Sequence, residues 1–568
     1  MIARAAMLTA AVLFGSAAAA QPAHDMSKMS GPMSMGLPPM PSIYGGQADK
    51  AGAPVFKDLG DHRFPVTATP AAQRYFDQGI NLVIGFNHAE AIRSFREAAR
   101  LDPNCAMCWW GLAFALGPNI NLPMPDDAVA PAWKALQNAK ALASKVTPRE
   151  RAWIAALETR YSPDPKADRG TLNAAFAEAM GKLAAAYPDD VDAATFYAEA
   201  MMDTQPWDYW EADAKTPKGH GAAIISTLEQ VLAKAPNHPG ALHLYIHAVE
   251  ASTTPERAES AADRLLTLMP KAGHIVHMPS HIYYRVGRYA DAARANELAA
   301  QVDEEYIAAC KAQGFYPAGY YGHNIHFLWT SAEMEGRYQT ALEAARRLVK
   351  AVDAENTAKQ MSVAELYVYT PWVTMLRFGK YQDLLAEPPP DPALTLDMAM
   401  WRYVQGFARA NTGDLNGAQE HRLALAALTK ADFSRFEPFG VPAAQMTEVA
   451  LASLDGEIAR MSGDLAAAIS HFRRAQALER ALPYTEPAYW HRPVSHLLGA
   501  ALLQANRPAE AEATFRDSLH HYRRDGWALM GLAQALQAQG KDAEARRVGA
   551  EFGEAWGRAD TRLETSRL

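Results

Sequence analysis

From Tyr75 onward, apolar and polar residues follow the period of a helix and not that of a strand. Apolar side chains return every three or four positions, alanine is frequent, and β-branched residues rarely alternate with polar ones. A helix with this spacing buries one apolar stripe against its neighbours. The pattern therefore predicts an all-α protein.

Small and large side chains are placed at regular intervals between residues 75 and 116. The residues that carry this pattern are Gly79, Ala91, Phe95, Ala98 and Pro103. The small residues let two antiparallel helices approach closely, and the proline ends the second helix. The stretch WWGLAFAL then begins another unit in the same phase. This arrangement resembles the tetratricopeptide repeat (TPR), which implies a TPR-type α-solenoid of helix-turn-helix repeats forming a curved superhelix.

Units with weaker signatures follow along the rest of the chain, for example HIYYRVGRYADAARANELA and LLGAALLQANRPAEAEATFRDSL. We expect the solenoid to cover residues 70–550 as roughly nine to twelve helix pairs. A C-terminal tail is expected over 551–568. Irregular inserts are expected where the pattern is interrupted, at residues 119–131, 203–221 and 387–392.

The first residues of the chain differ from the rest in kind. Residues 1–20 contain Arg4, then an apolar stretch, then a run of small residues. This is typical of a secretory signal peptide cleaved after Ala20, and it predicts a periplasmic or secreted protein. No later segment has eighteen uninterrupted apolar residues, so no transmembrane segment is expected after signal removal.

Residues 21–60 are rich in methionine, proline and glycine. A segment of this composition cannot bury a core and is expected to be a flexible tail. Its histidine and methionines include His24, Met26, Met29, Met33, Met35 and Met40. Thioether groups outside the cytosol suit soft ions such as Cu(I), and the alternative is a linker without any ligand.

Charge and cysteine content exclude some classes of protein. The net charge of −8 is mild, and no basic block indicates a nucleic-acid partner. Three cysteines are too few for a disulfide scaffold. In an oxidising compartment Cys105 and Cys108 can form a local disulfide. A redox or metal role and an inert reduced pair are the alternatives.

Histidine recurs at one register in the middle of the chain. Seven of the eighteen histidines lie between His243 and His326. His243 and His247 are four residues apart, and 34 residues later His277 and His281 repeat this spacing. Neutral imidazole is a common metal ligand, so the spacing predicts a metal site.

The TPR pattern places these histidines on a helical face that differs from the core face. When Ala258, Ala292 and Ala341 are aligned as the conserved alanine of the second helix, the histidines fall at positions 2, 5 and 9 of the repeat. Position 12, occupied by Glu250 and Glu333, lies with them in an arc of roughly 80°, about 130° from the core positions. By resemblance to TPR proteins, this face lines the concave groove where ligands bind.

Pro279 lies between two of these histidines and leaves two local structures open. Proline is tolerated in the first turn of a helix, so a helix that begins near Ile275 keeps the histidines on one face. If the helix begins at Pro279, His274 and His277 lie on the preceding loop and only His281 remains on that helix.

We expect the histidine-rich centre, about residues 238–330, to bind a transition metal. Histidines four apart on a helix can chelate one ion from a single face. The expected primary ligands are His243, His247, His277 and His281. Further ligands, or groups that orient the ligands, are His274, His323, His326 and Glu250. An imidazole-rich site suits copper, zinc or iron; the methionine-rich tail favours copper, whereas the glutamates favour zinc or iron.

Other polar groups are expected to line the groove or to support the ligands. They are Glu333, Glu486, His491 and His496, of which the last three lie in the stretch TEPAYWHRPVSH. A bound ion with an open coordination position could activate water or oxygen, with Glu250 or Glu333 as the base. The sequence indicates no substrate, so it leaves open whether the protein is an enzyme.

Two other interpretations of the histidine face remain. It could hydrogen-bond a polar or anionic ligand, or it could be purely architectural. In a different class, the solenoid could be an interaction scaffold that binds a peptide or a partner protein in its groove without metal. The wider pattern resembles secreted bacterial TPR proteins of unassigned biochemistry, which implies a fold and export but no activity.

Overall fold

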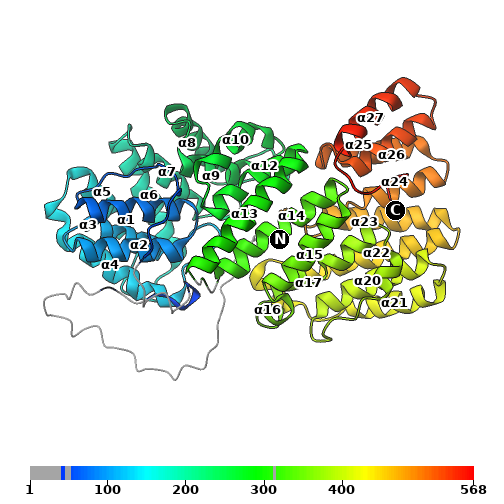
Figure 1. Cartoon of the computed structure of the whole chain (residues 1–568), viewed down its shortest axis with the longest axis horizontal. Coiled ribbons are helices and arrows are strands. Elements are labelled where there is room, and N and C mark those ends of the chain that lie inside the picture. The colour runs from blue at the N-terminus through cyan, green and yellow to red at the C-terminus, as the bar shows by residue number, and fades with distance from the viewer. Residues whose placement is uncertain (1–36, 38–39, 45–52, 311, 313–314, 568) are drawn as a thin grey trace. The chain divides into compact units, whose positions relative to one another are not determined.

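Helices account for nearly all of the regular structure (Figure 1). The computed structural model describes residues 37, 40–44, 53–310, 312 and 315–567. Within these residues, extended backbone pairs at two isolated bridges, Asn119–Leu122 and Trp210–Pro217. The predicted all-α class is confirmed for this part of the chain. The predicted signal peptide and the methionines before Met40 lie outside it.

The chain divides into two compact units. The N-terminal unit contains the described residues of 9–279 together with 299–321, and the C-terminal unit contains those of 280–298 and 322–568. Two helices near the division contain residues of both units, α12 (Pro279–Val286) and α13 (Tyr289–Cys310). Each unit is described by itself below.

In the N-terminal unit each helix packs against the next along the chain, from α1 to α11. These helices are α1 (Pro70–Ile84), α2 (His88–Leu101), α3 (Ala106–Ala115), α4 (Val129–Leu142), α5 (Pro148–Glu158), α6 (Arg169–Ala186), α7 (Val191–Met202), α8 (Gly221–Lys234), α9 (Pro239–Val249), α10 (Glu259–Leu268) and α11 (Gly273–His277). Consecutive helices that bury their faces against one another form the predicted solenoid. The first helix also contacts α9, which lies far from it in sequence.

The C-terminal unit repeats this arrangement from α14 to α27. Its helices are α14 (Gly322–Met334), α15 (Tyr338–Ala351), α16 (Ala354–Gln360), α17 (Glu365–Val368), α18 (Thr370–Arg377), α19 (Tyr381–Leu385), α20 (Thr395–Asn411), α21 (Leu415–Leu428), α22 (Ala443–Met461), α23 (Leu465–Arg480), α24 (Ser495–Gln504), α25 (Pro508–His521), α26 (Gly526–Gln537) and α27 (Asp542–Ala555). Both units therefore have the TPR-type fold that the sequence predicts.

In both units a phenylalanine ring packs against glycines of the helices before and after its own. A Cβ atom at Gly79 would lie 2.6 Å from the Phe95 ring, and one at Gly111 would lie 2.4 Å from it. The Phe515 ring stands in the same relation to Gly499 and Gly531, each at 2.2 Å. The small positions of the repeat pattern are thus small because an aromatic ring occupies the space of a side chain.

The interruptions of the repeat pattern coincide with non-helical segments. Residues 116–125, 203–220 and 386–394 lie between helices. The second of these inserts contains the isolated bridge between Trp210 and Pro217. The Trp210 side chain donates to the Ala248 carbonyl at 2.9 Å. The predicted inserts are confirmed, with boundaries shifted by a few residues.

Two stretches of the segment predicted as a flexible tail are packed against the N-terminal unit. Met40 and Tyr44 are buried, and the Ser42 amide donates to Asp127 at 2.8 Å. Near residue 56, the Gln78 side chain accepts from the Phe56 amide at 2.9 Å. The composition argument missed these contacts because a few buried apolar side chains and backbone hydrogen bonds, not a core of the segment's own, hold it in place.

The residues predicted as a C-terminal tail, 551–568, include the end of α27 and residues that contact the C-terminal unit. Helix α27 continues to Ala555, and residues after it contact earlier helices of the same unit. The Arg567 guanidinium donates to both oxygens of the buried Glu457 carboxylate at 2.7 Å, and Ser566 donates to the His496 carbonyl at 3.1 Å. A buried carboxylate needs a partner, and the last residues provide it.

Candidate metal centre

Three histidines of the N-terminal unit form a compact cluster that we call the histidine triad: His243, His247 and His274. The first two lie one turn apart on α9, and the third is on α11. One ring nitrogen of each lies within 4.8 Å of the others. Nitrogens bound to one ion at about 2.0–2.1 Å are at most about 4.2 Å apart, so shifts of less than about 1 Å would close the triad around an ion.

A backbone carbonyl orients the first member of the triad. His243 Nδ1 lies 2.7 Å from the Ile84 carbonyl oxygen, so Nδ1–H donates and Nε2 keeps its lone pair. Its Nε2 is 3.1 Å from Nε2 of His274. Two nitrogens bound to one ion at a tetrahedral angle lie about 3.3 Å apart, so this separation fits a shared ion.

A carboxylate orients the second member. His247 Nδ1 lies 2.9 Å from Glu250 Oε1, and both side chains are buried. In the tautomer that is protonated at Nδ1, the ring donates to the carboxylate and Nε2 carries the lone pair. A carboxylate behind a histidine is the usual outer support of a protein metal site. Glu250 is thus placed as an orienting group, one of the two roles that the sequence leaves open for it.

Aromatic rings surround the triad. The Phe86 ring lies 4.5 Å from His243 and 5.3 Å from His274, and Trp207 lies 4.8 Å from His247. The three histidines are only 1–2% exposed. The prediction that this face lines an open groove therefore needs correction. The loop after α1 and the insert before α8 supply rings that cover it.

Two of these rings are on strained backbone. Phe86 has φ 54° and Trp207 has φ 64°. This left-handed region is uncommon for bulky residues and costs of order 1–3 kcal/mol, and such outliers concentrate at functional sites. Both strained residues place their rings against histidines of the triad.

A small cavity adjoins the triad. It is lined by His243, Phe86 and Glu199 and has a volume of about 10 Å³. That is close to the smallest space that holds one water molecule. Burial raises the pKa of Glu199, with the charge of Asp203 acting in the same direction. The triad therefore has beside it a carboxyl group with a raised pKa and room for about one water molecule.

A second group of histidines in the same unit has a different chemistry, and the sequence analysis missed it. Nε2 of His62 and Nε2 of His238 lie 2.9 Å and 3.1 Å from the same oxygen of Asp192. His238 Nδ1 accepts from the Ala241 amide at 3.1 Å and so caps α9. The two histidines hold the pKa of Asp192 below its usual range, against the effect of burial. His238 precedes a helix-starting proline, which was the only sequence signal of this role.

Two predicted primary ligands remain, His277 and His281. Only His277 belongs to the same unit as the triad. His277 lies on α11 with its ring 5.9 Å from that of His274. His281 is on α12 and belongs to the C-terminal unit. There it lies 5.7 Å from the His323 ring and 3.5 Å from the Glu486 carboxylate. A one-residue break at Met278 separates the two short helices, so the second structure considered for Pro279 is correct, except that the preceding segment is itself a helical turn.

Two of the supporting groups predicted in the C-terminal unit are held by structural partners. His496 Nε2 lies 2.6 Å from Asp525, and Glu333 accepts from Arg377 at 3.1 Å. Burial raises the pKa of Glu333 and lowers that of His496. His326 and His491, by contrast, line a cavity together with Glu486 and His323.

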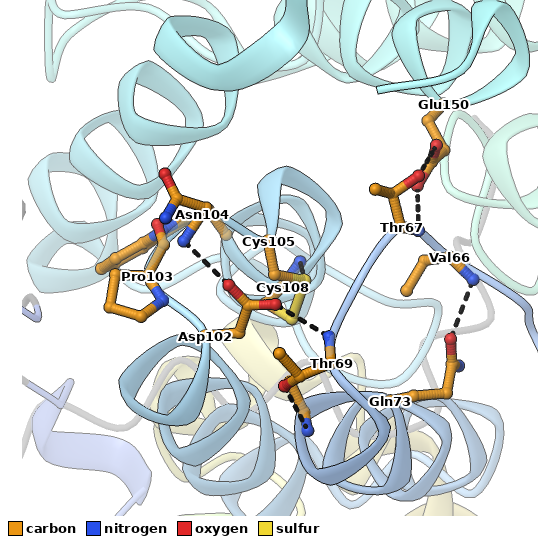
Figure 2. The surroundings of a disulfide bond; sticks show 12 residues. Val66, Thr67, Thr69, Gln73, Asp102, Pro103, Asn104, Cys105, Cys108 and Glu150 are labelled. Atoms are coloured by element: carbon orange, nitrogen blue, oxygen red, sulfur yellow. Dashed lines mark hydrogen bonds between the residues drawn. A yellow bond between two sulfur atoms is a disulfide. The ribbon is translucent and has the colours of Figure 1, made fainter. Parts of the chain in front are cut away.

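Cys105 and Cys108 are joined by a disulfide at the start of α3 (Figure 2). Both side chains are fully buried. Beside them, Asp102 accepts from the Thr69 amide at 2.8 Å and fixes the turn between α2 and α3 (Figure 2). Redox exchange and metal binding require an accessible thiolate, so this environment favours the structural interpretation.

None of the described helices is both long and apolar enough to cross a bilayer.

No protein-family model matches the sequence, and no curated protein matches it either. Solved structures with a similar course of helices include a human IFIT1 dimer with m7Gppp-AAAA, at 13% identity and a TM-score of 0.31 over 87% of this chain and 91% of that one. Others are the APC/C Cut9–Hcn1 hetero-tetramer (12%, 0.26, 86% and 94%) and the P58(IPK) TPR domain (11%, 0.22, 83% and 98%). These scores carry no argument about function. By its own helices, the chain is an all-α helical-repeat protein of the TPR type.

Proposed function

We propose that this chain is an exported helical-repeat protein that binds one transition metal ion through His243, His247 and His274. The observation that carries the proposal is the pair of hydrogen bonds from Nδ1 of His243 and His247 to Ile84 and Glu250. They fix the tautomer in which each Nε2 offers a lone pair, as ligand histidines require. Export rests on the signal-like residues 1–20.

Three imidazoles with a free position suit copper, zinc or iron. Copper is preferred because the chain also carries a methionine-rich segment before Met40. The neighbouring 10 Å³ cavity leaves room for a water molecule as a further ligand. Metal storage or delivery needs no more than the triad itself.

The experiment is metal analysis of the purified chain after reconstitution with copper, zinc or iron in turn. We expect one ion per chain, and single His243→Ala, His247→Ala and His274→Ala variants should each lose affinity by at least the roughly 10–100-fold known for orienting groups. His62→Ala is the matched control, since it removes a partly buried histidine from the Asp192 cluster of the same unit. Absence of stoichiometric metal, or equal loss in the control, would contradict the proposal.

The alternative is an interaction scaffold. Helices of the TPR type commonly present surfaces that bind a peptide or a partner protein. In this chain a hollow of about 500 Å³ lies beside Trp210, Glu229 and Arg257. The large hydrophobic side chains exposed among the described residues are scattered, namely Leu37, Val55, Leu298 and Leu423. Stable interfaces have a buried apolar centre, so this surface gives the scaffold function weaker support than the triad gives metal binding.

A further inference from the structure

A cavity in the C-terminal unit is lined by none of the residues of the histidine triad and has no part in the proposed metal function. It is formed by α14, by α17 and by the loop between α23 and α24, and its volume is about 50 Å³. One water molecule needs roughly 10–15 Å³ of such space, so the cavity has room for about three to five waters, or for a single five- or six-membered ring.

The walls of this cavity are aromatic. They include Trp329, Tyr367, Tyr369, Phe439 and Tyr489. The His326 ring is stacked on Trp329 with an interplanar angle of 2° and meets the edge of Tyr367 at 5.2 Å. Flat walls of this kind favour a flat ligand, which gains stacking and edge contacts.

Two imidazoles give the cavity its polar groups. His491 is 7% exposed, and neither of its ring nitrogens has a hydrogen-bond partner. Burial lowers its pKa well below the usual value, and Arg492 and Arg377 act in the same direction. Burial also lowers the pKa of His326 to about 3. Both rings are therefore neutral near pH 7, and each can offer one donor and one acceptor.

The charge balance of the cavity argues against an ionic ligand. The Glu486 carboxylate is the charged group in its wall, and it accepts from Tyr484 at 2.6 Å. Arg285 lies 3.7 Å from the same carboxylate and compensates its charge. A ligand cation would compete with this arginine, and a ligand anion would face the carboxylate. A neutral ligand meets neither penalty.

We propose that this cavity binds a small, neutral, planar heteroaromatic ring, with His326 and His491 as its hydrogen-bond partners and Trp329 in its wall. A nucleobase or a nicotinamide is of this class. Such a ring satisfies the buried nitrogens of His491, which an aromatic hydrocarbon of the same size leaves without partners.

The test compares matched ring probes on the full chain. Nicotinamide and cytosine are titrated against toluene, which has similar size but no hydrogen-bonding atoms, by calorimetry and by Trp329 fluorescence. We expect the two heteroaromatic probes to bind at least 10-fold more tightly than toluene. His491→Phe and His326→Phe keep a ring in place but remove its nitrogens, and each should abolish that preference while toluene binding persists.

His471→Phe is the control, because His471 is a partly exposed histidine on α23 that does not line the cavity. Thermal unfolding checks that each variant is folded, and His326→Phe alone decides the matter if the buried His491→Phe fails to fold. Equal affinity for toluene and the heteroaromatic probes would overturn the proposal, as would a preference for the heteroaromatic probes that survives in both variants. No binding of any probe at millimolar concentration would show a merely hydrated cavity and would overturn it too.

Discussion

The donor atoms of His243 and His247 are set by groups outside the triad. The Ile84 carbonyl and the Glu250 carboxylate hold Nδ1–H in each case. In the Asp192 cluster the carboxylate instead contacts Nε2 of both rings, His62 and His238. The two groups of histidines therefore differ in which ring nitrogen contacts the carbonyl or carboxylate oxygen: Nδ1 in His243 and His247, and Nε2 in His62 and His238.

The first prediction at this scale concerns Glu250. Glu250→Gln keeps an acceptor near His247 but removes its charge, so we expect about 10–100-fold weaker metal binding with an unchanged limiting stoichiometry. Competition with a chromophoric chelator measures the affinity. Glu229→Gln, at a half-exposed ion pair with Arg257, should leave it unchanged. An unaltered affinity in Glu250→Gln would show that the carboxylate does not support a ligand.

A second prediction concerns Asp397 in the C-terminal unit. It is fully buried, neither carboxylate oxygen has a hydrogen-bond partner, and burial raises its pKa well above 3.8. The folded state thus holds this proton more tightly than the unfolded chain, so stability falls as pH rises from about 3.8 through the raised value. Asp397→Asn cannot ionise and should remove this decline, by about 1.4 kcal/mol for each unit by which the pKa is raised.

Denaturant unfolding at a series of pH values checks this expectation. The variant should gain stability relative to the native sequence at about pH 8 and little at about pH 4. Asp517→Asn, at a half-exposed ion pair with Arg480, serves as the control and should show no such gain. Parallel pH profiles for the native sequence and Asp397→Asn would show that Asp397 is not the titrating group.

Single residues of the triad were only partly predictable. The i, i+4 spacing identified His243 and His247, because both lie on one helix. His274 was expected as a further ligand rather than a primary one, since the break at Met278 cannot be located from the pattern. Phe86 and Trp207 could not be anticipated, because only tertiary contacts hold bulky residues in the left-handed region.

At the scale of elements, the contact between glycine and phenylalanine sets the spacing of adjacent helices. A methyl group at such a glycine has to displace the ring or spread the helices. The repeat pattern in the sequence predicted these positions well, because the small and large residues that allow close packing recur at fixed intervals along the sequence. The inserts followed from the same pattern to within a few residues.

The third prediction tests this packing with two glycines in the C-terminal unit. Gly499→Ala places a Cβ 2.2 Å from the Phe515 ring and should cost about 1–3 kcal/mol through overpacking. Gly549→Ala on α27 has no heavy atom within 4 Å of its Cβ and should stabilise by up to about 1 kcal/mol through helix propensity. Chemical denaturation followed by circular dichroism compares the two. The same sign in both variants would refute the proposed role of the ring.

At the scale of the molecule, the proposed metal site joins helices that are distant in sequence. The hydrogen bond from His243 to Ile84 spans 159 residues, and α1 contacts α9 within the N-terminal unit. Repeats in a solenoid ordinarily contact only their neighbours. The sequence indicated each helix pair but not this contact, because a repeat pattern contains no information about which distant repeats meet.

The fourth prediction follows from this contact. An ion that binds only the folded state adds about 2.7 kcal/mol at a free concentration 100 times its Kd. Hydrogen–deuterium exchange should therefore slow on metal addition in α9, α11 and the end of α1, and remain unchanged in the C-terminal α22–α27. His274→Ala should abolish the slowing. Equal protection of both units would indicate non-specific metal binding.

The contact between Ile84 and His243 also gives the site an order of assembly during synthesis. A ribosome that has made only the first helices has produced the Ile84 carbonyl but none of the three imidazoles, and a chain clipped after α2 separates the carbonyl from its histidine. Metal retained by the protein would then report that everything from α1 to α11 has been made, folded and kept in one piece. The loop after α1 would serve as a check on the integrity of the chain.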